Sequence, residues 1–115
     1  MKMLYKNTKI EKICTDEKKA KIKFGENVAN KLFAALNAIE SASNLNDIFA
    51  LKQYNLHKLK GDLKNIHSMY LGKTTGYRLL LTPLDENEEP VICDDFSSYT
   101  MAVCVEIGEV SKHYD

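Results

Sequence analysis

The chain has 115 residues, the usual size of a single domain, which is enough for one hydrophobic core but not for two. Hydrophobic residues make up 44% of the chain and charged residues 28%, values that argue against wholesale disorder, and the formal net charge is zero. The first residues lack the apolar run of a signal peptide, and the longest apolar runs are too short to span a bilayer. Three cysteines without a CxxC spacing disfavour a disulfide framework or a zinc site, so we expect a protein of a reducing cytosol.

The zero net charge hides an uneven distribution. Residues 1–82 carry 15 Lys and Arg against 7 Asp and Glu, whereas residues 83–115 carry one Lys against 9 acids. The basic part could attract a polyanion such as RNA. The lysines between residues 18 and 23 are equally well explained as the solvated face of a helix.

The first half of the chain predicts one strand followed by helices. Met3–Tyr5 is a short apolar strand, and Thr8 is expected to cap a helix because Glu11 follows three residues later, as in a capping box. Asp16–Phe24 is a second helical stretch, and a helical turn is expected over residues 44–49. The clearest helix lies between them and has an apolar stripe, made of Val28, Ala29, Leu32, Phe33, Ala35, Leu36 and Ile39.

The second half predicts strands. The segments 67–71 and 77–81 are strand-like, and the residues from Gly72 to Gly76 suit a hairpin turn between them. Pro83 is expected to end the second strand, and residues 85–89 form an acidic loop. The apolar, β-branched segment 100–107 predicts a further strand, followed by a tail over residues 108–115. A strand, then helices, then antiparallel strands indicate one α+β domain over residues 1–115, with helices on one face of the sheet.

Polar and charged residues cluster just before the first of these antiparallel strands. His57, Lys58, Lys60 and Asp62 lie within six residues around Gly61, where a loop would hold them at a sheet edge. Histidine is the natural acid or base near pH 7, and a lysine such as Lys60 can stabilise phosphate charge. An ordinary polar turn has the same composition.

Arg78 is the only arginine of the chain and stands inside an apolar strand. Strand alternation would put its side chain on the face opposite Tyr77 and Leu79, where a solvated guanidinium can bind phosphate with two parallel hydrogen bonds. The alternative is a structural ion pair with an acid such as Glu106.

His113 and Tyr114 lie near the end of the chain, directly before Asp115. A solvated tail is the simple explanation, because terminal residues usually fray. If the last strand carries the two residues onto the sheet, a His and a Tyr beside cations would suit proton transfer or base stacking. His67 is expected to be a half-buried or edge histidine. The aromatic side chains expected in the core are Phe24, Phe33 and Phe49.

Four segments together resemble the HigB branch of the RelE/ParE toxin superfamily, over nearly the whole chain. They are the helical segment 14–20, the segment 55–62, the Tyr-Arg-Leu strand at 77–79 and the terminal His113-Tyr114. The most specific element is the pattern of His, Leu, Lys, Gly and Asp in residues 57–62, followed by a strand, a turn and the Tyr-Arg-Leu strand.

The resemblance implies a RelE-like α+β fold, with an N-terminal strand and helices packed on one face of a twisted antiparallel sheet. It implies the toxin of a type II toxin–antitoxin system, a cytoplasmic endoribonuclease without metal or cofactor. Such an enzyme cuts mRNA in the ribosomal A site by attack of the 2′-hydroxyl on the adjacent phosphate. The implied partners are the ribosome, mRNA and a HigA-like helix-turn-helix antitoxin that binds the toxin in a hetero-oligomer, with no membrane contact.

The resemblance also implies roles for single residues. His57 and His113 would transfer protons, with acid and base undecided, and Tyr114 would assist in proton transfer and stacking. Lys60 and Arg78 would stabilise the charge on the phosphate. The lysines expected to bind RNA are Lys58, Lys64 and Lys73.

The chain departs from the pattern of the family in two places. Many relatives end with an acid, a Tyr and a His, whereas this chain ends with His113, Tyr114 and Asp115. The acidic segment 85–98 looks like an insertion that could alter ribosome docking or serve the antitoxin. Because a fold does not determine a function, a ParE-like toxin that inhibits DNA gyrase without nuclease chemistry is the second hypothesis. An inert homologue that only binds an antitoxin is the third.

Overall fold

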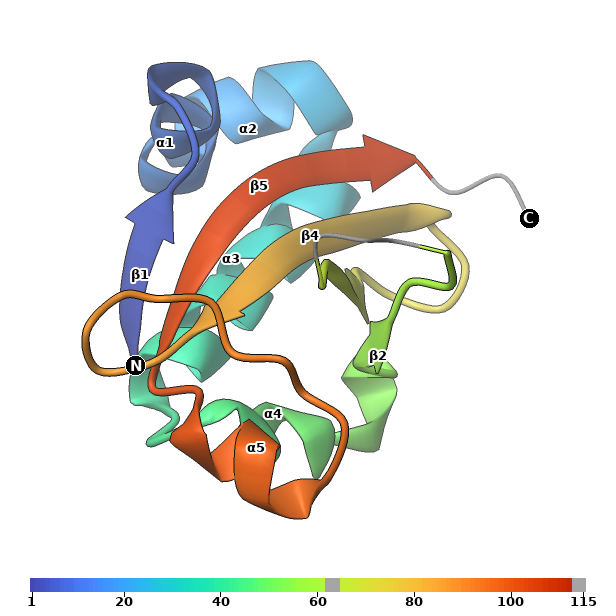
Figure 1. The fold of residues 1–115 in the computed structure, drawn as a ribbon. Coiled ribbons are helices and arrows are strands. Elements are labelled where there is room, and N and C mark those ends of the chain that lie inside the picture. The colour runs from blue at the N-terminus through green and yellow to red at the C-terminus, as the bar shows by residue number, and fades with distance from the viewer. Residues whose placement is uncertain (62–64, 113–115) are drawn as a thin grey trace.

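The computed structural model describes residues 1–61 and 65–112, which form a five-stranded sheet with helices packed against it (Figure 1). The strands are β1 (Lys2–Tyr5), β2 (His57–Lys58), β3 (His67–Tyr70), β4 (Tyr77–Leu84) and β5 (Cys104–Lys112), in the sheet order β1-β5-β4-β3-β2. The helices are α1 (Thr8–Thr15), α2 (Glu17–Phe24), α3 (Glu26–Ser41), α4 (Leu45–Phe49) and α5 (Phe96–Met101), with a 3-10 turn η1 at Lys52–Tyr54. The α+β class expected from the sequence is confirmed.

Polar caps determine where the first two helices begin. Asn7 caps α1, because its side chain accepts a hydrogen bond of 3.0 Å from the backbone N–H of Ile10. The expectation that Thr8 is the cap is therefore wrong by one residue, and Asn is at least as good a cap as Thr. Asp16 caps α2 in the same way, with the N–H of Lys19 at 3.2 Å.

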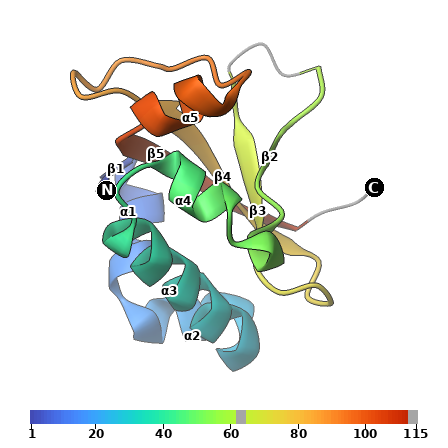
Figure 2. The ribbon, with the colours of Figure 1, turned by 90° about the horizontal axis from the view of Figure 1, so that it is seen from below.

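The helix α3 contributes the main helical layer of the core. Its apolar stripe is buried as expected, and Leu32 and Ile39 have no exposed surface. Figure 2 shows α1, α2 and α3 together on one side of the sheet. The sheet residues that face this layer are also fully enclosed, and they are Met69, Leu79, Leu81, Val105 and Ile107. Phe24 and Phe33 pack against the core, but Phe49 is 53% exposed, so its expected place in the core is wrong.

The sheet is mixed, which corrects the expectation of a purely antiparallel sheet. The strands β2, β3, β4 and β5 pair antiparallel, but β1 runs parallel to β5, with Lys2 opposite Cys104 and Tyr5 opposite Ile107. Two parallel strands need a long connection, and here nearly the whole chain lies between them.

The strand β4 continues past Pro83, contrary to expectation. Pro83 pairs with Val105 of β5, and its carbonyl accepts a hydrogen bond of 3.0 Å from the N–H of Val91. The N–H and C=O of a strand residue point the same way, so the missing N–H of Pro83 faces the side away from β5. Because β3 pairs with β4 only as far as Leu81, no bond of the sheet is lost there.

The last strand also differs from its predicted bounds. β5 begins at Cys104 and ends at Lys112, so the strand predicted at 100–107 starts too early and the tail predicted from Gly108 belongs to the sheet. A β-bulge explains the second error. Leu80 pairs with Glu109 but Leu81 pairs with Ile107, which leaves Gly108 as an extra residue that interrupts the alternation.

Two short helices, α4 and α5, close one end of the sheet and lie side by side (Figure 2). The N–H of Leu45 donates a hydrogen bond of 2.9 Å to the carbonyl of Ala102 and so ties the start of α4 to the end of α5. Asp95 caps α5 through the N–H of Ser98 at 2.8 Å, and Ser98 completes a capping box. The helix explains why residues 100–101 are not strand.

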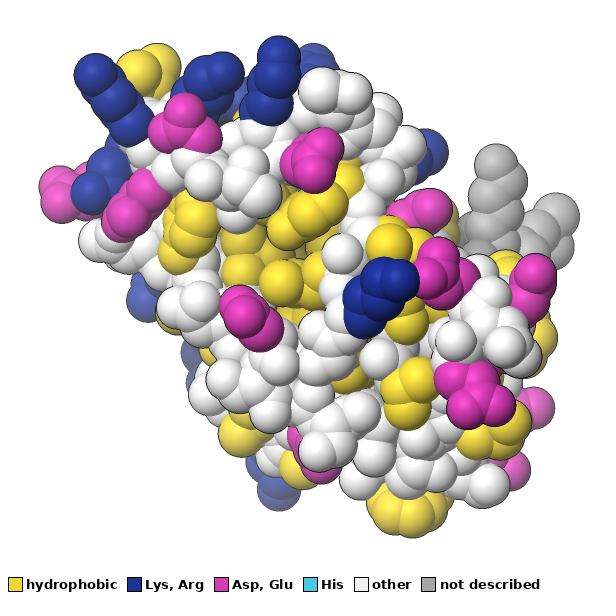
Figure 3. All heavy atoms as spheres, turned by 90° about the vertical axis from the view of Figure 1, so that its left-hand side faces the viewer, with side chains coloured by type: hydrophobic (Ala, Val, Ile, Leu, Met, Phe, Trp, Pro, Cys, Tyr) yellow, Lys and Arg dark blue, Asp and Glu magenta, His cyan; other side chains and the backbone are white. Residues whose placement is uncertain are grey.

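Lysines are most frequent on α1 and α2, although these helices also carry Glu11 and Glu17. In Figure 3, Lys and Arg side chains gather along the upper edge, where α1 and α2 lie. Asp and Glu side chains are scattered among apolar ones toward the lower right of the same view. Within residues 1–61 and 65–112, no helix is both long enough and apolar enough to cross a membrane.

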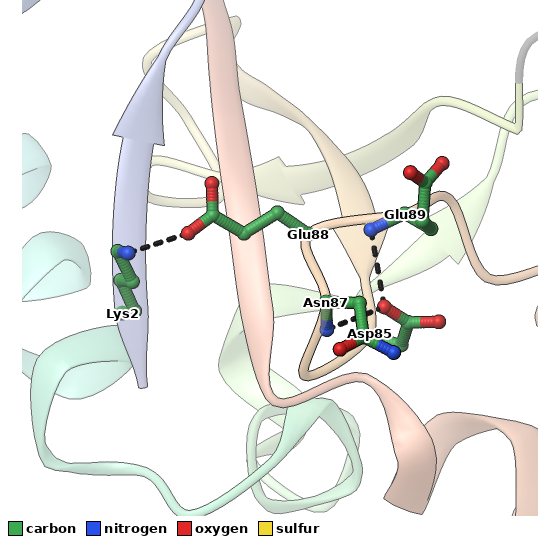
Figure 4. A network of polar contacts seen from close by, with 5 residues as sticks. All are labelled: Lys2, Asp85, Asn87, Glu88 and Glu89. Carbon is green, nitrogen blue, oxygen red and sulfur yellow. Dashed lines mark hydrogen bonds and ion pairs between the residues drawn. The ribbon is translucent and has the colours of Figure 1, made fainter.

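The acidic loop between β4 and α5 is an ordered turn (Figure 4). One carboxylate oxygen of Asp85 accepts hydrogen bonds from the N–H groups of Asn87 and Glu89, at 2.8 and 3.0 Å. The carboxylate of Glu88 lies 2.5 Å from Nζ of Lys2 and so connects the loop to β1. Both partners of this ion pair are exposed. The pair therefore contributes little to the free energy of unfolding, and its main effect is on the position of the loop.

Candidate functional site

One face of the sheet is left uncovered by α1, α2 and α3, and we call it the open face (Figure 1). Side chains alternate along a strand, so β4 sends Leu79 and Leu81 into the core and Arg78 and Leu80 to the open face. Residues directly opposite each other on neighbouring strands share a face. Tyr70 of β3 is opposite Arg78 and therefore also lies on the open face.

Arg78 is held by two neighbours from β3. Its guanidinium carbon lies 4.9 Å from the centre of the Tyr70 ring, and Nη1 donates a long hydrogen bond of 3.5 Å to Oγ of Ser68. Stacking of this kind is worth about 0.5–1 kcal/mol at a partly exposed site. Among the residues described, no carboxylate lies within ion-pair distance of Arg78, so the alternative pairing with Glu106 is not formed. The guanidinium is therefore oriented, and within the described part of the chain the carboxylates leave its charge unpaired.

His57 stands on the next strand with a defined tautomer. It is opposite Ser68, and its ring meets the Tyr70 ring edge-on at 6.3 Å between centres. Its Nδ1 lies 2.7 Å from the carbonyl oxygen of Asn55. Because a carbonyl only accepts, Nδ1 carries the proton, and in the neutral ring Nε2 is the atom that can take a proton from a substrate. Asn55 adopts the left-handed conformation (φ 43°) that asparagine tolerates.

The turn between β3 and β4 adds a second cation to this end of the open face. Arg78, Tyr70 and Lys73 line a shallow hollow of about 120 Å³, with Gly72 and Gly76 at its rim. The Lys73 side chain is exposed. Two positive charges therefore border one hollow beside an aromatic ring, an arrangement that favours an anion with a planar group attached.

Other predicted residues lie elsewhere. Lys58 is opposite His67, so its side chain leaves the sheet on the face opposite that of His57. Three of the predicted site residues lie outside the described residues, namely Lys64, His113 and Tyr114.

Lys60 is separated from Arg78 along the sheet. The N–H of Leu59 donates a hydrogen bond of 2.9 Å to the carbonyl of Ile66, and Lys60 follows in the turn beyond this bond. Ile66 stands four residues before Tyr70, about 13 Å along an extended chain. The structure therefore brings His57 and Arg78 to the same Tyr70 ring, and holds the backbone of Lys60 apart from Arg78.

The far part of the open face is acidic. Glu109 is opposite Leu80, and Glu106 is opposite Thr82, on the same face as Arg78. These residues border a groove of about 440 Å³ that also reaches Lys6. The open face thus changes from cationic near the hairpin turn to anionic near β1, so an anionic chain would be attracted to the first end only.

Buried polar groups behave as parts of the structure. Burial raises the pKa of the Cys14 thiol to about 12 and that of Cys93 to about 11, so neither forms the reactive thiolate at neutral pH. His67 is fully buried rather than half-buried, with Nε2 at 3.0 Å from the hydroxyl of Tyr99. In the described part of the chain, His, Cys, Asp and Glu side chains form no group of three that could hold a metal ion.

Tyr70 and Ser68 are the residues of this site that sequence reasoning missed. The signal for Tyr70 was present, because the pairing of a hairpin can be counted outward from its turn. The N–H of Leu71 bonds to the carbonyl of Tyr77 at 3.0 Å, and the next pair is Tyr70 with Arg78. Ser68 is not opposite Arg78 but opposite Leu80, and it contacts Arg78 because the arginine side chain is long.

Comparison with models of known protein families, with curated proteins and with solved structures gives no match for this chain. The arrangement of the open face, together with the motifs of the sequence, is therefore the basis for a functional proposal.

Proposed function

We propose that this chain is a HigB-type toxin with a RelE-like fold, an endoribonuclease that cuts mRNA in the ribosomal A site. The observation that carries the proposal is the meeting of His57, Tyr70 and Arg78 on an uncovered sheet face. Cleavage of an RNA backbone requires a base, an acid and a cation for the charge on the phosphate, and His57 and Arg78 are suited to the first and third of these tasks.

The proposed reaction needs no group beyond RNA and the protein. Nε2 of His57 takes the proton of a ribose 2′-hydroxyl, and the oxygen forms a bond to the adjacent phosphorus. The bond from phosphorus to the 5′-oxygen breaks, which leaves a 2′,3′-cyclic phosphate and a 5′-hydroxyl once the leaving oxygen is protonated. Arg78 stabilises the added negative charge on the phosphate oxygens. By the resemblance, His113 or Tyr114 would supply the proton to the leaving oxygen.

The ring of Tyr70 would have two tasks in this reaction. It orients Arg78, whose guanidinium lies 4.9 Å from the ring centre, and the half-buried ring would contact a base of the mRNA. Lys73 in the neighbouring turn would bind RNA, as would Lys58 and Lys64. By the resemblance, Lys60 would join Arg78 in stabilising the charge on the phosphate that is cleaved.

The test is induction of the protein in cells that translate a reporter mRNA, followed by primer extension. We expect cuts in frame with codons, and a loss of about 100-fold or more in cutting for both Arg78→Ala and His57→Ala. The matched control is Lys12→Ala, which removes an exposed cation of α1 that belongs neither to the hollow at Arg78 nor to the groove at Glu106. Growth arrest with intact mRNA would contradict the proposal.

One observation favours a second candidate, a ParE-like toxin that inhibits DNA gyrase without cutting RNA. Glu106 and Glu109 stand on the same open face as Arg78, and Lys60 lies apart from it. An RNA chain would be repelled from the acidic half of the face, whereas a protein partner would not. Loss of DNA supercoiling by purified gyrase on addition of the protein would favour this candidate.

The proposal places the protein in the cytoplasm, where ribosomes and mRNA are. It also implies a HigA-like helix-turn-helix antitoxin that silences the toxin in a hetero-oligomer. Whether the adjacent gene encodes such a protein is a simple check. Co-expression of that protein should restore growth in cells in which the toxin is induced.

A further inference from the structure

Large apolar side chains are exposed at the end of the molecule formed by α4 and α5. Among the residues described, six large hydrophobic side chains are exposed, and five of them lie in or next to these helices. The five are Phe49, Leu51, Ile92, Phe96 and Met101, and we call the surface that they form the α4–α5 face. Phe96 is 69% exposed, and α5 contains no buried residue at all. Large apolar side chains that are exposed together on two neighbouring helices are a common feature of places where a partner binds.

The exposed helix α5 is nevertheless held firmly. The capping box of Asp95 and Ser98 closes its first turn, and the hydroxyl of Tyr99 lies 3.0 Å from Nε2 of the fully buried His67. The ring of Phe49 packs on the ring of Tyr99 at 5.3 Å between centres, which joins the apolar groups of α4 and α5. The side chains are thus presented on a fixed backbone, which lowers the entropic cost of binding.

Negative charge borders the α4–α5 face on the side of α5. Residues 85–101 contain six Asp and Glu and no Lys or Arg. Asp94 and Asp95 directly precede Phe96, and hydrogen bonds from the backbone N–H and hydroxyl of Ser98 lower the pKa of Asp95. Figure 3 shows acidic and apolar side chains interspersed toward this end of the molecule, far from the lysines of α1 and α2.

A small hollow on this face has the chemistry of a site for a basic side chain. Met101 and Val103 line it together with Asp85 and Glu86, and its volume is about 280 Å³. The aliphatic stem of a Lys or Arg can lie on apolar groups while its charged end reaches a carboxylate. The hollow therefore accommodates one long cationic side chain beside the apolar surface.

We infer that the α4–α5 face binds a basic amphipathic helix of another protein, whose apolar side chains cover Phe49 and Phe96 and whose Lys or Arg enters the hollow at Met101. Charge complementarity carries the choice of partner, because the carboxylates repel nucleic acid and attract a cationic peptide. The inference does not rest on the nuclease proposal, since the face shares no residue with His57, Tyr70 and Arg78.

A second copy of this chain is a weaker candidate for the partner. The helix α2 is itself basic and exposes Ile22 to 78%, so it has matching chemistry. A contact from α2 of one copy to the α4–α5 face of the next would be head-to-tail, and each copy would leave another site open. Such contacts build open chains instead of a closed oligomer, so a separate protein fits the face better.

The test is titration of the full chain with a synthetic helix of about 18 residues that carries Leu on one face and Lys on the other. We expect binding detected by calorimetry, and no binding of the same peptide with Glu in place of Lys. Phe96→Ala should weaken binding about tenfold, and Glu86→Lys should weaken it several-fold, most at low salt. Ile22→Ala removes an equally exposed apolar side chain at the other end and is the matched control, expected to change affinity by less than about twofold.

Several outcomes would overturn the inference. Equal binding of the Glu peptide, or equal losses for Ile22→Ala and Phe96→Ala, would show that the α4–α5 face has no special role. Sedimentation that shows assembly of the protein alone, abolished by both of these variants, would assign the face to a second copy. All three substituted side chains are exposed, and circular dichroism of each variant confirms that it is folded.

Discussion

The open face and the α4–α5 face are supported in different ways. On β4, Arg78 stands between Tyr77, which packs on Phe24 at 5.4 Å, and the fully buried Leu79. The functional side chain is thus fixed because its neighbours in sequence belong to the core. The helix α5 has no buried residue and is held by its cap and by hydrogen bonds to its neighbours. Burial fixes one surface and polar contacts fix the other, so we expect them to respond to different changes.

The largest effect should come from removing the core support of the open face. Leu79→Ala deletes a fully buried side chain and should lower the free energy of unfolding by about 2–5 kcal/mol in urea titrations. The adjacent Arg78→Ala should cost far less, because its guanidinium has no ion pair among the described residues. Equal costs for the two variants would show that Arg78 is a structural residue.

Removal of a single hydroxyl group should weaken the attachment of α5 to the core. Tyr99→Phe removes the hydroxyl that meets the buried His67 and should cost about 1–2 kcal/mol of stability. Hydrogen exchange should become faster in α5 while the amides of β4 keep their protection. Tyr54→Phe is the control, and a uniform loss of protection across the sheet would contradict a local role for this bond.

The stacking of Arg78 can be tested without removing its charge. Tyr70→Leu should lower the rate of RNA cleavage about tenfold, because the guanidinium loses the ring that orients it. Tyr70→Phe keeps the ring and should act nearly as the natural chain does. If Phe and Leu have the same effect, the hydroxyl of Tyr70 is needed instead of its ring.

The smallest effect is a change in the response to acid. Hydrogen bonds from Ser98 lower the pKa of Asp95 in the folded protein, so its stabilising contribution is present above the ordinary pKa and is lost as the pH falls through the folded value. Asp95→Asn keeps a good cap but does not titrate. The drop in melting temperature between about pH 6 and about pH 2.5 should be smaller in this variant than in the natural chain. An equal drop would show that Asp95 does not contribute.

Sequence periodicity predicted the parts of the fold that depend on neighbouring residues. The stripe of α3, the hairpin around Gly72–Gly76 and the α+β class all follow from patterns within about 20 residues. His57 and Arg78 were identified as chemically notable by residue type and place. Their joint position was expected only through the resemblance, and the resemblance itself remains a prediction.

Predictions from sequence periodicity were wrong where the conformation of a strand depends on pairing with a distant segment. Pro83 continues a strand because β3 has already ended on the side of its missing N–H. The bulge at Gly108 puts both Ile107 and Val110 toward the helices although they are three residues apart, so alternation in the sequence stops there while the strand continues. The neighbouring strand determines both the continuation of β4 past Pro83 and the bulge at Gly108. The sequence of one segment does not show which strand will pair with it.

By itself, the sequence determined which residues this protein can use: one arginine, three histidines, and a basic and an acidic half. Only the tertiary structure decided which of them meet. Pairing of β2 and β4 with β3 brings His57 and Arg78 to the same Tyr70 ring and holds the backbone of Lys60 away from Arg78. The tertiary structure also leaves Phe96 and Met101 of α5 on the surface. Register and packing are long-range properties, whereas composition and periodicity are local.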